Sequence, residues 1–110
     1  MPNSKQIVDA MMANGAFSQW LGIEVVDTSP GSATLQMTLR DDMTNGFGVA
    51  HGGISYSLAD SALAFASNGH GQHAISVETS ISHAKPIRVG DLLVATAAER
   101  QRGKSLARYD

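Results

Sequence analysis

The feature that most constrains the fold of this chain is a glycine-rich segment that runs directly into an apolar helix. The segment from Asn45 to Asp60 reads N-G-F-G-V-A-H-G-G-I-S-Y-S-L-A-D, with four glycines within eight residues. Because glycine reaches positive φ without steric cost, the segment predicts a loop of unusual backbone geometry. The residues from Ile54 to about Asn68 predict a helix. Such a loop presents free N–H groups and the positive end of the helix dipole, which favours binding of an anion or a developing oxyanion.

The predicted helix is apolar around most of its circumference, which is typical of a buried helix. Its few polar side chains recur at spacings of three, four and seven residues and share one stripe: Tyr56, Ser57, Asp60 and Ser67. The pattern leaves open whether this stripe faces solvent or carries chemistry. An isolated aspartate on a buried helix is costly unless it is paired or hydrated, so Asp60 is a candidate functional group. A carboxylate is a weak base toward water, so an oxyanion site at the loop amides would have to contribute the larger effect.

The chain before the glycine loop predicts a short helix and a β-hairpin. Apolar residues recur at helical spacing over residues 4–14, with Ser4 as the expected N-cap. Residues 21–25 and 32–40 alternate between apolar and polar around a turn at residues 28–31. One face of this hairpin is therefore expected to be covered and the other to be polar, as in an antiparallel sheet.

The chain after the helix predicts further strands. Residues 75–82 alternate between apolar and polar, and residues 92–98 are apolar on both faces, which favours a central strand. A hairpin turn at residues 101–104 is followed by the start of another strand at residues 105–109. The expected fold class is α+β, with a curved antiparallel sheet wrapped around one long apolar helix. Residues 1–110 are expected to form a single domain.

Composition argues against several classes of protein. The 110 residues are enough for one domain, and a net charge of −2 gives little support to a nucleic-acid partner. No apolar run reaches the length of a membrane span, and the N-terminal residues lack the pattern of a signal peptide. The absence of cysteine excludes a disulfide framework, a thiolate zinc site and a cysteine nucleophile. A cytoplasmic protein without nucleic-acid or membrane partners is expected.

Common catalytic motifs are also absent. His70-x-x-His73 lies in a glycine-rich loop rather than at the helical spacing of a zinc protease, so a metal site is disfavoured. Gly46-x-Gly48-x-x-His51 resembles a dinucleotide fingerprint but follows a hairpin instead of a parallel βαβ strand. No Gly-Lys-Ser/Thr opens the helix, and no Gly-x-Ser-x-Gly nucleophile elbow occurs. These patterns leave Asp60 and the glycine loop as the candidate chemistry.

Taken together, several segments resemble the hotdog-fold acyl-CoA thioesterases, in particular the PaaI-type branch of phenylacetic acid degradation. The resemblance covers roughly residues 15 to 110. Its strongest part is the spacing from asparagine through His-Gly-Gly to aspartate. It is carried by Asn45-Gly46, Ala50-His51-Gly52-Gly53, Leu58-Ala59-Asp60, Lys85-Pro86, Gly90-Asp91, Gln101-x-Gly103-Lys104 and Arg108-Tyr109-Asp110.

The resemblance implies a hotdog fold, assembled as a homodimer or homotetramer, with a site shared across the dimer interface. The Gly52 N–H would polarise the thioester carbonyl. Asp60 would activate water as a general base or attack as a nucleophile. Asn45 would hold water or the carbonyl, and His51 would support the loop. No cofactor is implied.

The same resemblance implies further contacts with an acyl-CoA substrate. Ser76 resembles a serine that assists the water in some relatives, and Gly53 adjoins the carbonyl site. Four cations are candidates for the coenzyme A phosphates, although ordinary solvated surface charge explains each of them equally well: Lys85, Arg88, Arg102 and Lys104.

Two features depart from the pattern of these relatives. They usually continue beyond this point, so the chain is expected to be C-terminally truncated relative to the family, with one or more strands missing. His83-Ala84 stand where relatives often carry larger aromatic residues, which is expected to change the acyl pocket.

The expected function is hydrolysis of an aryl- or medium-chain acyl-CoA, such as phenylacetyl-CoA, to the free acid and CoA. A non-catalytic acyl-CoA-binding protein on the same fold is an alternative, and it would need Gly52 but not Asp60. A hotdog hydratase is a weaker alternative. Some of those enzymes place a histidine five positions after the catalytic aspartate, whereas this chain has Phe65 five positions after Asp60.

Overall fold

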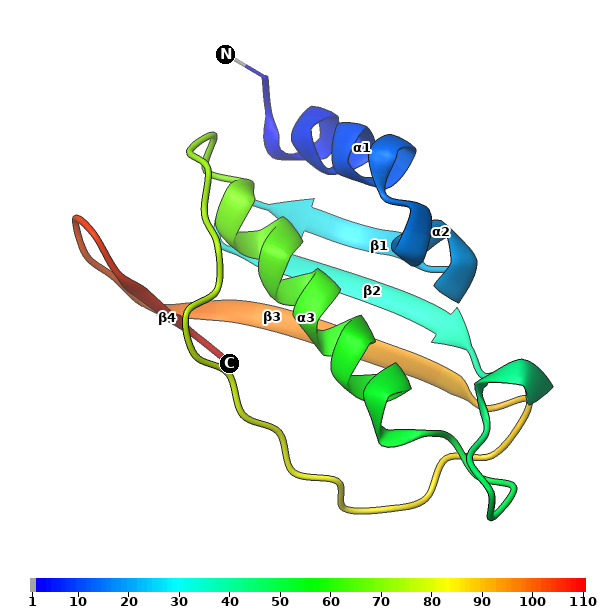
Figure 1. Cartoon of the computed structure of the whole chain (residues 1–110). Helices are drawn as coiled ribbons and strands as arrows, with labels where there is room; N and C mark the ends of the chain where they lie inside the picture. Colours follow the sequence, from blue (N-terminus) through cyan, green and yellow to red (C-terminus); the bar gives the residue numbers. More distant parts are fainter. Residues whose placement is uncertain (1) are drawn as a thin grey trace.

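A long helix lying across an antiparallel sheet dominates the computed structural model, which describes residues 2–110 (Figure 1). The elements in chain order are α1 (Ser4–Asn14), α2 (Ala16–Leu21), β1 (Glu24–Ser29), β2 (Ser32–Thr38), a 3₁₀ turn (Asp41–Met43), α3 (Gly52–Asn68), β3 (Leu92–Arg102) and β4 (Ala107–Tyr109). The sheet order is β1-β2-β3-β4, and each neighbouring pair is antiparallel. The expected α+β arrangement of a sheet packed against one long helix is therefore confirmed.

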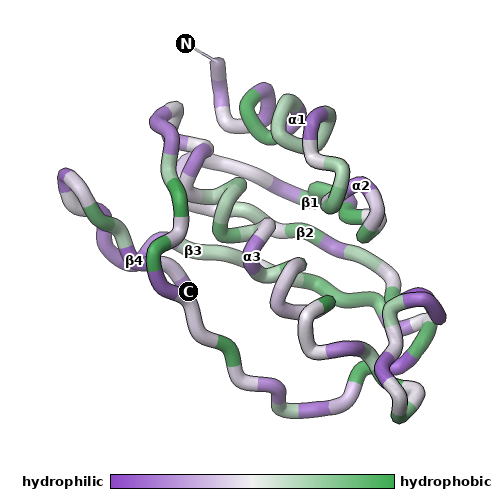
Figure 2. The backbone as a smooth tube through the Cα atoms, in the orientation of Figure 1, coloured by the Kyte–Doolittle hydropathy of each residue, from purple (hydrophilic) through white to green (hydrophobic). Residues whose placement is uncertain are grey.

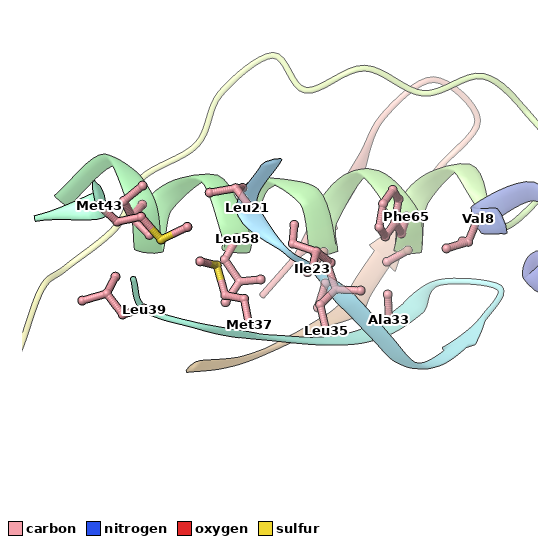
Figure 3. Close-up of a cluster of buried hydrophobic side chains, with 14 residues drawn as sticks. Val8, Leu21, Ile23, Ala33, Leu35, Met37, Leu39, Met43, Leu58 and Phe65 are labelled. Atoms are coloured by element: carbon pink, nitrogen blue, oxygen red, sulfur yellow. The ribbon is translucent and has the colours of Figure 1, made fainter. Parts of the chain in front are cut away.

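The core lies between α3 and the sheet (Figure 3). The alternation along β2 places Leu35 and Met37 in the core, fully buried. From α3, one face is buried against them: Ile54, Leu58, Ala62, Phe65 and Ala66. The helix is buried on this face, as its apolar composition indicated, whereas Ala59 and Asp60 on another face are exposed. A small or polar side chain loses little by exposure, so apolar composition alone did not reveal the open face.

The N-terminal helix is capped by Asn3, not by Ser4 as the sequence predicted. The Gln6 N–H donates to Asn3 Oδ1 at 2.9 Å, and the Asn3 N–H donates to Gln6 Oε1 at 2.9 Å, which forms a reciprocal capping box. Ser4 is instead buried, and its Oγ donates to the carbonyl oxygen of Gly69 at 2.9 Å. Ser4 therefore ties α1 to the C-terminal end of α3.

The connection between α3 and β3 contains no strand, so the strand predicted over residues 75–82 is wrong in this chain. Figure 1 shows the connection as the long yellow-green segment that sweeps round the open side of α3. Apolar and polar residues alternate along it (Figure 2), yet Ile75 is 90% exposed and Val77 is 79% exposed. A strand needs a hydrogen-bonding neighbour about 4.8 Å away, and none lies beside this segment within residues 2–110. The alternation alone therefore could not establish a pairing partner for this segment.

A part-buried polar cluster fixes the far end of α3 to the sheet. His70 Nε2 donates to Glu99 Oε1 at 2.8 Å, and the Tyr109 hydroxyl donates to the same oxygen at 3.1 Å. The hydrogen bond from His70 is the main reason why the pKa of Glu99 lies below its ordinary value of 4.5, although burial opposes it. Gly31, at φ +81°, passes so close that a Cβ there would lie 3.2 Å from His70 Nε2. The cluster thus links the β1–β2 turn, β3, β4 and the second residue after α3.

We expect Glu99→Gln to destabilise the fold at neutral pH and to remove part of its acid sensitivity. Because the folded-state pKa of Glu99 is lowered, its contribution is complete above pH 4.5 and is lost as the pH falls through the folded-state pKa. Urea midpoints of the wild type and the variant should therefore differ at pH 7 and converge toward pH 3. The exposed Glu78→Gln is the control. A difference that stays constant with pH would contradict the expectation.

Candidate active site

The glycine loop is held in shape by the side chain of Asn45. The N–H groups of Phe47 and Val49 donate to Asn45 Oδ1 at 2.9 and 3.4 Å, and the Asn45 N–H donates to the Val49 carbonyl at 2.8 Å. Gly48 adopts φ +77°, which a residue with a Cβ rarely does. Asn45 Oδ1 is therefore used inside the loop, and its NH₂ group is the part of the side chain left to bind something else.

His51 is the N-cap of α3. Its ring Nδ1 accepts the Gly53 N–H at 2.9 Å, and its backbone N–H donates to the Met43 carbonyl at 2.9 Å. Since Nδ1 accepts, the ring proton resides on Nε2. The Gly53 N–H is thereby occupied, whereas the Gly52 N–H has no acceptor within residues 2–110. Of the two predicted glycines, Gly52 thus presents the free donor at the positive end of α3.

A hollow of about 320 Å³ opens in front of this N-terminus. It is lined by Ala50, Gly52, Ser55, His83, Ala84, Lys85, Pro86 and Ile87. The ring of His83 faces Gly52, and a Cβ on Gly52 would lie 3.4 Å from His83 Nε2. His83 Nδ1 lies 3.4 Å from Ser55 Oγ. The resemblance pointed to His83 only as a departure at the acyl pocket, and no sequence pattern singled out Ser55 or paired it with His83, because only the fold brings the connection against the start of α3.

Asp60 lies on the same helix as Gly52 but does not face the same hollow. Eight residues separate the two, which corresponds to about 12 Å along the helix axis. The free N–H of Gly52 points out of the helix end, whereas Asp60 projects sideways from an exposed face. One thioester cannot contact both groups of a single chain, since the reacting atoms must lie about 3–3.5 Å apart.

The predicted phosphate-binding cations fall at two ends of the molecule. Lys85 lines the hollow, and Arg88 lies in the turn that leads into β3, where its N–H donates to Asp91 Oδ2 at 2.9 Å. Arg102 and Lys104 lie at the β3–β4 hairpin, about 33 Å away along the 11 residues of β3 (Figure 1). Ser76 is exposed in the connection.

Neither a metal centre nor a membrane-spanning helix is found within residues 2–110. No three His, Cys, Asp or Glu side chains in this part of the chain converge as metal ligands. Within the same residues, every helix is too short or too polar to cross a membrane.

Comparisons with known proteins place this geometry in a family. A protein-family model described as "Thioesterase superfamily" matches residues 47–110, which is more than half of the chain. Acyl-coenzyme A thioesterase PaaI of Escherichia coli K12 is 39% identical over 96% of this chain and 75% of that protein. The structure of the E. coli PaaI protein, from the phenylacetic acid degradation operon, matches with a TM-score of 0.94 at 38% identity, over 96% of this chain and 77% of that one.

More distant relatives show the same likeness. Human acyl-coenzyme A thioesterase 13 is 31% identical over 94% of this chain and 76% of that protein. The structure of smu.793 from Streptococcus mutans UA159, bound to acetyl-CoA, matches with a TM-score of 0.72 at 26% identity, over 74% of this chain and 66% of that one.

These matches identify both the fold of the chain and its protein family. A helix wrapped by an antiparallel sheet, with a glycine loop at the helix start, is the hotdog fold. The chain belongs to the thioesterase superfamily.

Proposed function

We propose that this chain hydrolyses the thioester of an aryl- or medium-chain acyl-CoA, such as phenylacetyl-CoA, to the free acid and CoA. The observation that carries the proposal is the free Gly52 N–H, which faces the hollow at the positive end of α3 while an exposed carboxylate, Asp60, stands two turns along the same helix. An acyl-CoA substrate agrees with the named activities of E. coli PaaI and human thioesterase 13, and with the acetyl-CoA bound to smu.793.

In the proposed reaction, the thioester carbonyl oxygen accepts the Gly52 N–H. Negative charge that develops on this oxygen is stabilised by the same N–H and by the α3 dipole. Asp60 takes a proton from a water that attacks the carbonyl carbon, or attacks that carbon itself to form an anhydride that water then hydrolyses. The C–S bond breaks when the tetrahedral intermediate collapses. The sulfur leaves as the CoA thiolate and takes up a proton.

Asn45 and His51 have separate tasks in this scheme. The Asn45 NH₂ group, which the loop leaves free, donates to the attacking water or the carbonyl. His51 does not meet the substrate through Nδ1, because this atom caps Gly53. It instead keeps the start of α3 in the conformation that exposes the Gly52 N–H. Gly53 then contributes a small surface beside the carbonyl rather than a donor.

The proposed site is shared between two chains of a homodimer, or of a homotetramer built from such dimers. Gly52 and Asp60 lie about 12 Å apart along α3 and face different directions, so each must work with the other group from a second chain. Distance along the chain likewise means that the four candidate phosphate-binding cations at one site come from two chains. Lys85 and Arg88 lie near the Gly52 end, and Arg102 and Lys104 lie at the opposite end of β3. Ser76, exposed on the connection, is available to the water of either site.

Release of free CoA thiol from a panel of acyl-CoA esters tests the proposal. Phenylacetyl-CoA, hexanoyl-CoA and acetyl-CoA cover aryl, medium and short acyl groups. We expect turnover, with the aryl or medium-chain ester preferred. Binding of these esters by folded, dimeric protein without thiol release would contradict hydrolysis and favour the acyl-CoA-binding alternative, for which the free Gly52 N–H is sufficient.

A further inference from the structure

The ring of His83 stands over the site proposed for the thioester carbonyl, although the hydrolysis scheme above gives it no task. His83 Nε2 lies 3.4 Å from where a Gly52 Cβ would be. Since a Cβ is two bonds from its own backbone nitrogen, about 2.5 Å, Nε2 lies within about 6 Å of the Gly52 nitrogen. An acyl group whose carbonyl accepts the Gly52 N–H therefore passes directly beside this ring nitrogen.

Ser55 makes two contacts that are satisfied together in one tautomer of His83. The Ser55 hydroxyl donates its single hydrogen to the Gly52 carbonyl at 3.2 Å, as serine often does one turn back along a helix. In the 3.4 Å contact with His83 Nδ1, the hydroxyl oxygen is then free to accept, which matches the neutral tautomer with its proton on Nδ1. Nε2 is left as an acceptor that faces the hollow and has no donor within residues 2–110.

We infer that His83 is a specificity residue, whose Nε2 accepts a hydrogen bond from a hydroxyl near the carbonyl of the acyl group, so that this chain prefers 2- or 3-hydroxyacyl-CoA esters to their unsubstituted counterparts. The inference rests on the proposed binding of the thioester at Gly52. Apart from Ser55 and Lys85, the side chains that line the hollow beside His83 are apolar: Ala50, Ala84, Pro86 and Ile87. These four offer no side-chain acceptor and Lys85 is a donor only, so a hydroxyl that binds among them without a partner is penalised.

The substrate pair that tests this inference is 3-hydroxyhexanoyl-CoA and hexanoyl-CoA. The wild type should show a higher kcat/KM for the hydroxylated ester. His83→Phe keeps a ring but removes the acceptor, and we expect it to lower the ratio of the two kcat/KM values about tenfold. His83→Gln places an amide oxygen near the position of Nε2 and should retain most of the preference. An unchanged ratio in His83→Phe, or a Gln variant that behaves like Phe, would overturn the inference.

Binding measurements separate this inference from the proposed hydrolysis. Ketone analogues with a methylene between the sulfur and the carbonyl keep the acyl group but cannot be hydrolysed. Calorimetry with the hydroxylated and plain analogues should give the same tenfold loss of discrimination in His83→Phe. If the wild type discriminates in binding but releases no thiol from any ester, the hydrolase proposal fails and the specificity inference stands. If thiol is released but neither kcat/KM nor binding distinguishes the hydroxylated from the plain compound, the specificity inference fails and the hydrolase proposal stands.

Discussion

Asp60→Asn is expected to lower kcat for acyl-CoA hydrolysis by about 10²–10⁴-fold, because an amide neither accepts a proton from water nor attacks the carbonyl as a carboxylate does. Asp60 is exposed within the chain, so the isosteric change should leave the fold and its stability nearly unchanged. KM should change little, since the carbonyl contact at Gly52 remains. Thiol release under saturating substrate measures the effect.

The control for this variant is Asp9→Asn. Asp9 is also an exposed helical aspartate, paired with Lys5 at 2.8 Å on α1, away from the glycine loop. It should keep full activity. Matched circular dichroism and elution volume would show that all three proteins have the same fold and assembly. An Asp60→Asn protein that retains activity within a factor of a few would remove this residue from the chemistry.

Gly52→Pro is expected to lower kcat by about 10²–10³-fold by removing a single N–H. Proline suits the first position of a helix, which is where Gly52 lies, and it favours an extended conformation in the residue before it. His51 already has φ −61° and ψ 137°. Gly52→Ala is the matched control, because it keeps the N–H and adds a Cβ at an ordinary 3.4 Å from His83 Nε2. Equal losses in both variants would indicate crowding rather than loss of the donor.

Combining the two inactive variants tests whether the site is shared. When Asp60→Asn and Gly52→Pro chains are co-expressed, about half of the dimers are mixed, and each mixed dimer carries one intact Gly52–Asp60 combination out of two. Activity should therefore return to about a quarter of the wild-type value. A site built within one chain would give no such recovery.

The parts of the fold that the sequence predicted are those in which a local pattern reflects burial. The alternation of β2 placed Leu35 and Met37 on the covered face, where both are fully buried, and the apolar run after the glycine loop predicted α3. Such periodicities report which faces are covered, and they do not depend on knowing the neighbouring element.

The parts that were wrong depend on partners distant in sequence. Residues 75–82 have the alternation of a strand, but a ladder requires a neighbour that periodicity cannot name. Ser4 has the composition of an N-cap, yet it is used in a buried hydrogen bond to Gly69, and Asn3 caps the helix. The approach of His83 to Gly52 likewise has no signature in either local segment.

The candidate site likewise contains features that a local pattern predicts and features that depend on contacts between residues distant in sequence. The glycine loop and the cap by His51 are local: the glycine pattern predicted the loop, and the resemblance implied a supporting role for His51. The choice of Gly52 over Gly53 as the donor came from the resemblance alone, because the run of glycines does not reveal which N–H the histidine ring occupies. The exposed face around Asp60 becomes part of the site only under the proposed sharing between two chains, and no local sequence pattern reveals such sharing.

The position of Gly52 and Asp60 on one straight helix has a mechanical consequence under the proposed sharing of sites. In a dimer, the start of each α3 would serve one catalytic centre and its middle would serve the other. A tilt or shift of a single α3 would then alter the carbonyl contact in one centre and the position of the carboxylate in its twin at the same time. Neither centre could be adjusted alone. An acyl group that displaces α3 at one catalytic centre would therefore also change the geometry of the other centre.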